Sequence, residues 1–169
     1  MLGGLIEKLH RRIDLTEVEA ATAMSEIMGG RVPSALIAGM LVALSIKGER
    51  ASEIVGFAGT MREKAVPLRC SFTDVFDTCG TGGDGLNTFN VSSVSAIVLA
   101  ACGVRVAKHG NRSVSSKCGS ADLFEGLGVN VVADPPVVER CLTDVGIAFF
   151  FAPTFHPAMR HVAQTRREL

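Results

Sequence analysis

Hydrophobic positions recur every three to four residues through residues 1–69, a spacing typical of helices. Thr16 offers an N-cap oxygen, Gly29 and Gly48 follow apolar stripes as helix stops, and Pro33 suits a first turn. The pattern predicts helices over residues 3–12, 15–28, 33–47 and 52–64. Because the connections are short, neighbouring helices should be antiparallel, and an all-helical domain is expected.

Beyond residue 70 the pattern changes to short apolar runs that alternate with helical segments. Strands are predicted over residues 73–77, 104–107, 129–132 and 147–151. Helices are predicted over residues 91–102, 119–127 and 135–145, and from Pro157 to the end. This alternation is typical of β-α-β units in a mainly parallel sheet. The expected fold class is α/β, with a small helical domain over 1–69 and a parallel β-sheet flanked by helices over 70–169.

Composition limits the partners that the chain can have. The 169 residues include 17 basic and 17 acidic side chains, and this zero net charge argues against broad binding to nucleic acid or membrane headgroups. Trp and Tyr are both absent, which removes the usual stacking platforms for bases. No apolar run reaches the length of a membrane span, and the N-terminus lacks the pattern of a signal peptide. We therefore expect no nucleic-acid partner and no membrane partner.

The cysteines and histidines offer little chemistry by their spacing. The cysteine count, five, is odd and no Cys-x-x-Cys pair occurs, so reduced thiols in a cytoplasmic protein are the simpler interpretation. Cys79 and Cys118 lack a His/Asp pattern for nucleophilic catalysis. No carboxylate is placed in the sequence to orient His109 as a base, and His156 and His161 do not have zinc-ligand spacing.

A glycine-rich loop, Gly80-Thr81-Gly82-Gly83-Asp84-Gly85, follows the first predicted strand. Its glycines let backbone N–H groups approach an anion closely. Asn90, Ser92 and Ser93 follow at the start of a predicted helix, where N–H groups and the helix dipole favour phosphate. The alternative is an ordinary strand-to-helix turn with an N-cap serine. The sequence has more small polar residues here than such a cap would need. The loop therefore predicts an anion site.

The same loop matches the Gly-x-Gly-x-x-Gly pattern of dinucleotide-binding folds, but two features argue against a nicotinamide site. Residues 86–90 separate the last glycine from a plausible helix start. An acidic residue for a ribose hydroxyl is expected about 20 positions later, where the sequence has Arg105 and Lys108. No Gly-Lys-Ser/Thr follows, which excludes a Walker loop as well.

A second polar loop, from Lys108 to Ser116, follows the second predicted strand. Ligands of open α/β sheets bind at the carboxyl ends of strands, so the two loops are expected to lie side by side. Lys108 and Arg112 would supply cations, although either alone could be a solvated surface charge. Residues 119–122 begin the next helix and offer a further N-terminus to an anion.

Four segments resemble, in order, the signatures of the anthranilate phosphoribosyltransferase family. They are Asp77–Gly85, Asn87–Ser93, Lys108–Arg112 and Gly119–Asp122. The final Thr165–Leu169 resembles the family's stretch with an anthranilate-contacting arginine, and the resemblance covers the whole chain. It implies a glycosyltransferase that moves a phosphoribosyl group from phosphoribosyl pyrophosphate to anthranilate. The products would be N-(5-phosphoribosyl)anthranilate and pyrophosphate, in tryptophan biosynthesis.

The resemblance also implies roles for individual residues. Contacts to phosphoribosyl pyrophosphate are expected from Gly80, Gly83, Asp84, Thr88, Asn90, Val91, Ser92, Ser93, Lys108, His109, Gly110, Asn111, Arg112, Ser113, Val114, Ser115, Ser116 and Ser120. Anthranilate would be held by Gly80, Asn111 and Arg166. Ser92 would ligate one Mg²⁺ ion. A homodimer through the helical domain is implied too, although the apolar stripes of that domain could equally be internal core.

The implied mechanism needs little acid–base chemistry. Mg²⁺, backbone amides and Lys108 would stabilise the leaving pyrophosphate, and the aromatic amine would capture an oxocarbenium-like ribosyl centre. The family's chain is roughly twice as long, and its paired Asp-Glu for a second magnesium lies beyond Leu169. We therefore expect a truncated form with a sheet that is incomplete at the C-terminus. Such a chain should be catalytically poor and marginally folded, because strands lack partners.

Two other functions stay open. A pyrimidine nucleoside phosphorylase shares the overall architecture, but that family carries a Lys-His-Ser-Thr-Gly-Gly type signature in its first loop. Here the pair Lys108-His109 lies in the second loop. A non-catalytic relative that binds nucleic acid is disfavoured by the neutral charge and the missing aromatic residues.

Overall fold

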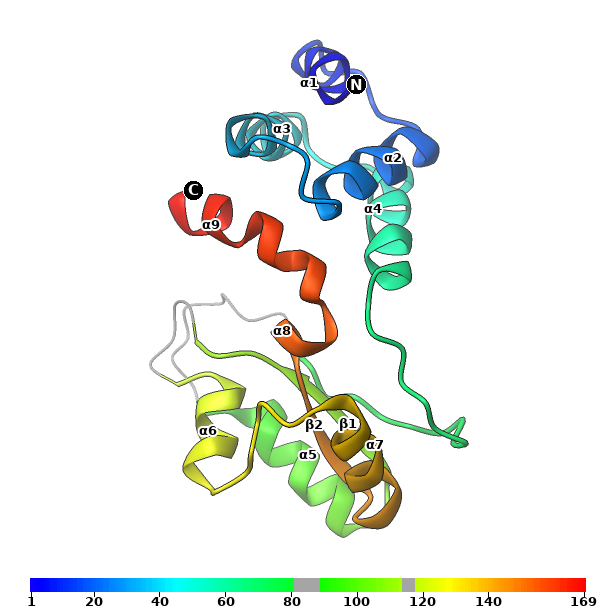
Figure 1. Cartoon of the computed structure of the whole chain (residues 1–169), viewed down its shortest axis with the longest axis vertical. Helices are drawn as coiled ribbons and strands as arrows, with labels where there is room; N and C mark the ends of the chain where they lie inside the picture. The colour runs from blue at the N-terminus through cyan, green and yellow to red at the C-terminus, as the bar shows by residue number, and fades with distance from the viewer. Residues whose placement is uncertain (81–88, 114–117) are drawn as a thin grey trace. The chain divides into compact units, whose positions relative to one another are not determined.

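The chain divides into two compact units in the computed structural model, which describes residues 1–80, 89–113 and 118–169. One unit, the helical unit, consists of Met1–Ala65 and His156–Leu169 (Figure 1). The other, the α/β unit, consists of Val66–Phe155. The final helix thus groups with the N-terminal helices. The domain limit expected near residue 70 stays a prediction.

The helical unit contains the four predicted N-terminal helices together with the final one. Their bounds are α1 Leu2–His10, α2 Glu17–Met28, α3 Ser34–Lys47, α4 Ala51–Glu63 and α9 Arg160–Glu168, with a 3-10 turn η1 at Pro157–Met159. The apolar stripes meet in one core, where Leu9, Leu15 and Met40 are almost fully buried and Val162 of α9 joins them. Among the described residues of either unit, no helix combines the length and apolar character needed to cross a bilayer.

Glu53 of α4 is fully buried and anchors the start of α2. Its carboxylate accepts hydrogen bonds from the N–H groups of Leu15 and Arg50, both at 2.8 Å, and from Lys47 Nζ at 3.0 Å. Lys47 Nζ also pairs with Asp14 at 2.8 Å. Burial by itself raises the pKa of Glu53, but the two N–H groups and Lys47 outweigh it and lower the pKa. The buried charge is therefore compensated within the unit.

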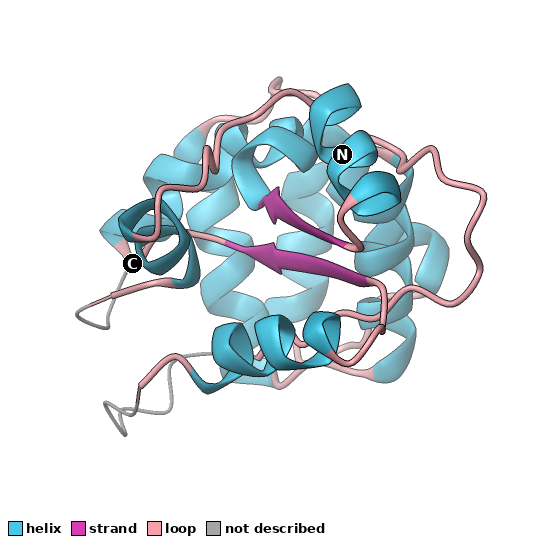
Figure 2. Ribbon diagram, turned by 90° about the horizontal axis from the view of Figure 1, so that it is seen from below, coloured by secondary structure: helices cyan, strands magenta, loops and turns pink. Residues whose placement is uncertain are grey.

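The α/β unit is built on two parallel strands, β1 Val106–Gly110 and β2 Ile147–Phe151, which lie side by side among helices (Figure 2). The helices are α5 Val91–Ala101, α6 Ser120–Gly126, α7 Pro135–Asp144 and the short α8 Ala152–Phe155. Phe150 packs against Leu142 of α7, whereas Phe149 packs against Phe124 of α6, so successive side chains of β2 face opposite layers. A parallel sheet flanked by helices confirms the α/β fold class.

Two of the four predicted strands differ from the structure. Residues 129–132 form turn and loop, so the strand predicted there is wrong. Asn130 explains the difference, because its side chain accepts a hydrogen bond from Val132 N–H at 3.3 Å and its carbonyl one from Ala133 N–H at 3.4 Å. Such local turns compete with a strand ladder. Of residues 73–77, Phe76 alone forms a bridge, parallel to Val106.

Candidate functional site

The chain segments that follow Phe76 and β1 leave the sheet at the same edge, because both pairings are parallel. Asp77 ties the two segments together. Its Oδ1 accepts hydrogen bonds from Cys79 N–H at 2.9 Å and from His109 N–H at 3.3 Å. The segments that lead into the two predicted loops thus lie side by side. Residues 81–88 and 114–117 of the loops lie outside the described residues, so the placement of the loops themselves stays a prediction.

Lys108 and His109 lie on β1, so their predicted place in a loop after the strand is wrong. The reason is the ladder with β2, which pairs Lys108 with Phe149 and His109 with Phe150. Lys108 is only 1% exposed, and its Nζ donates to the carbonyl of His109. Its side chain lines an apolar cavity of about 270 Å³ together with Ile97 and Phe124. Among the described residues, the hydrogen-bond partner of the ammonium is thus a carbonyl oxygen and not a carboxylate.

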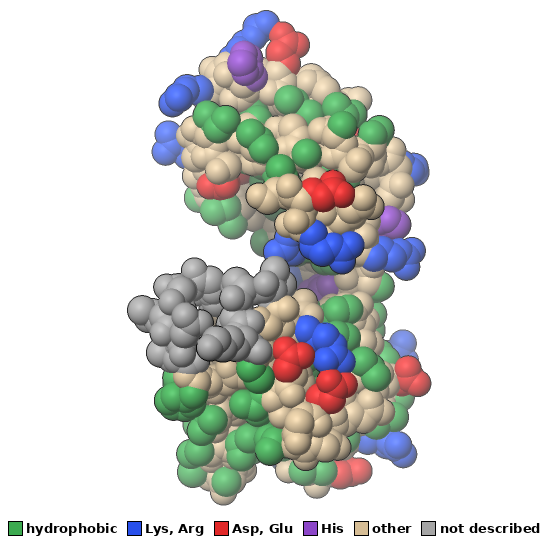
Figure 3. Space-filling model, turned by 90° about the vertical axis from the view of Figure 1, so that its left-hand side faces the viewer, with side chains coloured by type: hydrophobic (Ala, Val, Ile, Leu, Met, Phe, Trp, Pro, Cys, Tyr) green, Lys and Arg blue, Asp and Glu red, His purple; other side chains and the backbone are tan. Residues whose placement is uncertain are grey.

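Arg112 is engaged by α6. Its guanidinium lies 2.7 Å from Glu125 and 3.2 Å from Asp122. The pKa of Arg112 is raised, mainly by the hydrogen bond with Glu125 and by the negative charge of Glu125. The Asp122 carboxylate raises it further. Figure 3 shows basic side chains close to acidic ones on the surface of this unit. The positive charge expected from Arg112 is therefore largely neutralised by its own neighbours.

The N-terminus of α5 presents polar groups that its own helix does not use. Ser93 is fully buried, and its hydroxyl has no hydrogen-bond partner among the described residues. Asn90 does not cap α5 with its side chain, which instead donates to the carbonyl of Gly119 at 3.1 Å. Ser92 is half-buried, and its carbonyl accepts a hydrogen bond from Thr78 Oγ1 at 2.7 Å. The start of α5 therefore contacts Thr78, which precedes the Gly-rich loop, and Gly119, which follows the second loop.

The N-terminus of α6 holds the end of β1 by close backbone approach. The Asn111 carbonyl accepts hydrogen bonds from Ala121 N–H at 3.1 Å and from Ser120 Oγ at 3.4 Å. Asp122 accepts from the N–H groups of Ser113 at 3.0 Å and Gly119 at 2.8 Å, and these bonds lower the pKa of Asp122. A Cβ on Gly119 would lie 2.3 Å from the Ser113 nitrogen, so the approach requires glycine.

Several predicted site residues are placed elsewhere or not described. Gly83, Asp84, Thr88, Val114, Ser115 and Ser116 lie outside the described residues. Gly80 and Asn111, expected to hold anthranilate, are exposed in the α/β unit. Arg166 is exposed on α9 and belongs to the helical unit.

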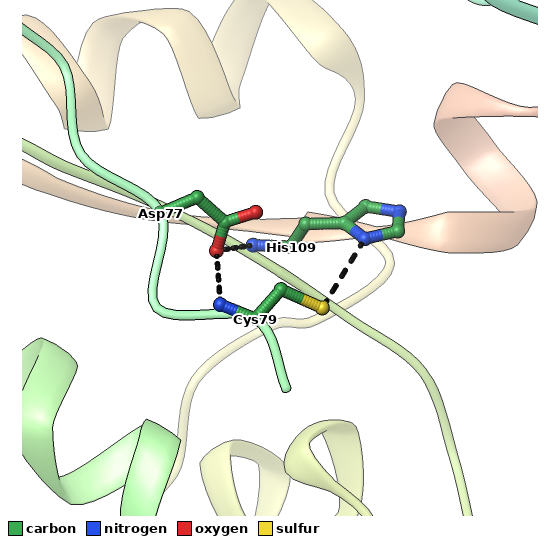
Figure 4. Close-up of side chains that lie close together, drawn as sticks. All are labelled: Asp77, Cys79 and His109. Atoms are coloured by element: carbon green, nitrogen blue, oxygen red, sulfur yellow. Dashed lines mark hydrogen bonds between the residues drawn. The ribbon is translucent and has the colours of Figure 1, made fainter. Parts of the chain in front are cut away.

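Sequence spacing missed one cluster, formed by Asp77, Cys79 and His109 (Figure 4). One ligand atom from each side chain lies within 4.8 Å of the other two. Cys79 Sγ is 3.9 Å from His109 Nδ1. The available signal was topological, because Asp77 and Cys79 follow Phe76 and His109 is the penultimate residue of the neighbouring strand β1. Parallel neighbours bring these positions together although they are about thirty residues apart.

Two family models match the chain. The glycosyl transferase family, helical bundle domain, matches residues 4–65, and the glycosyl transferase family, a/b domain, matches residues 73–169. Among curated proteins, the anthranilate phosphoribosyltransferase of Moorella thermoacetica is 54% identical over all 169 residues, which cover 50% of that protein. That of Chloroflexus aggregans is 56% identical over 94% of this chain and 46% of its own. The chain thus spans about half the length of the curated relatives it matches.

Comparison with solved structures points to the same family as the sequence comparisons. The crystal structure of anthranilate phosphoribosyltransferase from Thermus thermophilus has a TM-score of 0.90 at 49% identity, over 96% of this chain and 50% of that one. The enzyme from Saccharomyces cerevisiae, in complex with PRPP and Mg, has a TM-score of 0.88 at 27% identity, over 99% and 50%. The resemblance inferred from the four segments is confirmed: the chain belongs to the glycosyl transferase family and is similar over its length to the N-terminal half of anthranilate phosphoribosyltransferases.

Proposed function

We propose that the chain acts in the transfer of a phosphoribosyl group from phosphoribosyl pyrophosphate to anthranilate, in tryptophan biosynthesis. The relatives are named for this activity. The structural observation that carries the proposal is the Ser93 hydroxyl, which is buried and has no hydrogen-bond partner among the described residues. Leaving such a group unsatisfied costs about 1–3 kcal/mol, so a ligand that accepts or donates there is favoured.

The donor would bind between the first turn of α5 and the end of β1. Ser92 and Ser93 supply hydroxyl donors, and the helix N-terminus favours negative charge. Lys108, in the middle of β1, adds a buried positive charge beneath this end of the sheet. Donors of this kind would stabilise the charge that develops on the leaving pyrophosphate. Hydrogen bonds from Asn90 to Gly119 and from Ser120 to Asn111 hold the surrounding backbone in place.

Mg²⁺ is the ion that we propose for this site, and the yeast relative has been solved in complex with PRPP and Mg. The ion prefers oxygen ligands and keeps several waters, so a single hydroxyl can suffice from this part of the chain. The half-buried Ser92 fits, because its carbonyl is already engaged by Thr78 and its hydroxyl is the oxygen that remains. When bound, the ion would neutralise pyrophosphate charge.

Anthranilate would be held by Gly80, Asn111 and Arg166. The space around Gly80 is open, since no heavy atom of the described chain lies within 4 Å of the position of an added Cβ. The Arg166 guanidinium would pair with the anthranilate carboxylate. A variant of the yeast relative has been solved in complex with 4-fluoroanthranilate. Catalysis would then depend on holding amine and ribose in line.

Calorimetry with phosphoribosyl pyrophosphate and Mg²⁺ tests the donor site. Ser93→Ala should weaken binding roughly tenfold, equal to about 1.4 kcal/mol for a lost hydrogen bond. The variant should stay folded, because the hydroxyl has no partner in the protein part described. Ser95→Ala, a half-buried serine of the same helix, is the matched control. Equal affinity of both variants and the parent would refute the site. In a separate assay, cleavage of uridine by phosphate would support the alternative function as a pyrimidine nucleoside phosphorylase.

We also propose a homodimer through the helical unit. A groove of about 600 Å³ lies between α1 and α3, lined by apolar residues that include Ile6, Val42 and Ile46. Ile46 is 68% exposed, so the groove offers apolar surface to a second copy. Sedimentation should give a dimer for the parent and a monomer for Ile46→Glu. Val18→Glu, a similarly exposed apolar position on α2, should stay dimeric.

A cytoplasmic location is proposed as well. Cys70, Cys79, Cys102 and Cys141 are free, and Cys79 and Cys102 are exposed. Exposed free thiols are usual where the compartment is reducing. Thiol titration of protein taken directly from cells should find all of them reduced.

A further inference from the structure

The side chains of Asp77, Cys79 and His109 form a cluster to which the proposed transfer gives no joint role, and His109 alone is an expected contact of the donor. The three groups come from two chain segments that meet at the edge of the sheet (Figure 4). The Cys79 thiol points toward the His109 ring, with 3.9 Å between Sγ and Nδ1. Thiol, imidazole and carboxylate are the three side-chain ligand types of protein zinc sites.

The separations are close to those that a tetrahedral ion imposes. Zn–S and Zn–N lengths of about 2.3 and 2.0 Å at a tetrahedral angle place sulfur and nitrogen about 3.5 Å apart. The observed 3.9 Å is within a few tenths of an ångström of that value. All three ligand atoms lie within 4.8 Å of one another, so the widest separation must contract by at most about 1.3 Å when an ion binds.

The backbone already orients the carboxylate. Asp77 Oδ1 accepts hydrogen bonds from Cys79 N–H and His109 N–H, the two residues that supply the other ligands. Within the described residues its Oδ2 has no such bond, which leaves that oxygen for an ion. Hydrogen bonds of this kind around a ligating group raise metal affinity by fixing its direction.

We propose that Asp77, Cys79 and His109 bind one Zn²⁺ ion, with a fourth position open to water or a small ligand. The thiolate and imidazole select Zn²⁺ over Mg²⁺, which prefers oxygen ligands. The site is therefore separate in chemistry from the Mg²⁺ proposed at Ser92. It does not depend on the transfer reaction.

Titration of the 169-residue chain with Co²⁺, followed by absorption, tests the site. A thiolate-to-cobalt charge-transfer band should saturate at one ion per chain, and added Zn²⁺ should abolish it. Cys79→Ser should remove the band, whereas Cys102→Ser, an exposed cysteine at the end of α5, should retain it. Asp77→Asn keeps an oxygen that can accept from the two N–H groups but removes the negative charge. Both Asp77→Asn and His109→Gln should weaken Zn²⁺ binding by roughly tenfold or more.

A second measurement uses the unmodified chain, so that no variant needs to fold. Zn²⁺ should protect Cys79 from alkylation by iodoacetamide, measured by peptide mass spectrometry, and should leave Cys102 reactive. An unchanged band in Cys79→Ser, or equal labelling of Cys79 with and without Zn²⁺, would overturn the proposal.

Discussion

The two units differ in whether their buried polar groups have hydrogen-bond partners of opposite charge or polarity. In the helical unit the carboxylate of Glu53 is matched by two backbone N–H groups and by Lys47. In the α/β unit the hydroxyl of Ser93 is buried without a partner among the described residues, and the ammonium of Lys108 donates to a carbonyl. Matched groups stabilise a fold, whereas unmatched groups favour a ligand. The helical unit thus holds a compensated buried charge, whereas the α/β unit holds the unmatched groups that we propose for donor binding.

The strongest test of this contrast removes the charge of Glu53. Glu53→Gln leaves Lys47 with the half-exposed Asp14 as its carboxylate partner, which compensates only part of the buried charge. Breaking the buried pair should therefore lower the free energy of unfolding by about 3 kcal/mol, at the low end for such pairs. Urea denaturation measures the change. Glu49→Gln, an exposed position nearby, is the control and should be neutral. A small loss in Glu53→Gln would contradict a structural role for this network.

The next largest effect concerns the backbone that carries the binding groups. Gly119→Ala would place a methyl group 2.3 Å from the Ser113 nitrogen, so the α6 N-terminus must move away from residues 111–113. We expect a loss of about 2 kcal/mol, in the range of overpacked sites. Gly126→Ala, with nothing within 4 Å of its added Cβ, should not destabilise. Equal stability of the two variants would show that the close approach is not needed.

The smallest effect is electrostatic and belongs to the helical unit. Lys8 and the Thr16 N–H group lower the pKa of Glu19 from 4.5 to about 2. A lowered pKa stabilises the folded state above the unfolded value, and this contribution is lost as the pH falls from 4.5 toward 2. Unfolding free energies across this window should therefore fall less steeply in Glu19→Gln. Added salt should reduce the difference, because the pair with Lys8 is partly exposed. Parallel slopes in the two proteins would argue against this ion pair.

Local signals in the sequence were sufficient for the helices. Thr16 caps α2 as predicted, with its hydroxyl 3.2 Å from the Glu19 nitrogen, and Gly48 ends α3 with a φ of 82°. These features depend on neighbours three or four residues away, which a periodic pattern records. The prediction of a strand at residues 129–132 was wrong because strands depend on distant partners and not on local signals alone. A run of β-branched residues has strand propensity, but a strand also needs a partner, and Asn130 offered a local turn instead.

The site was predicted in part. The polar positions at the start of α5 follow from residue types alone, and the parallel topology brings Asp77 and Cys79 beside His109. The surroundings of the Lys108 and Arg112 side chains could not be predicted from residue types. Lys108 is buried because the β1 ladder extends to Gly110, and Arg112 is paired because α6 presents Glu125 and Asp122 to it.

The sequence by itself determined the α/β class, the order of helices, the family resemblance and the residue types of the proposed anion site, because each depends on short-range patterns and motifs. The tertiary structure alone decided which polar groups are matched and which are not. It buried Glu53 against Lys47, left Ser93 unmatched among the described residues, and brought Asp77 and Cys79 to His109. Such contacts join residues that are distant in the chain, and only the packing of parallel strands and helices makes them neighbours.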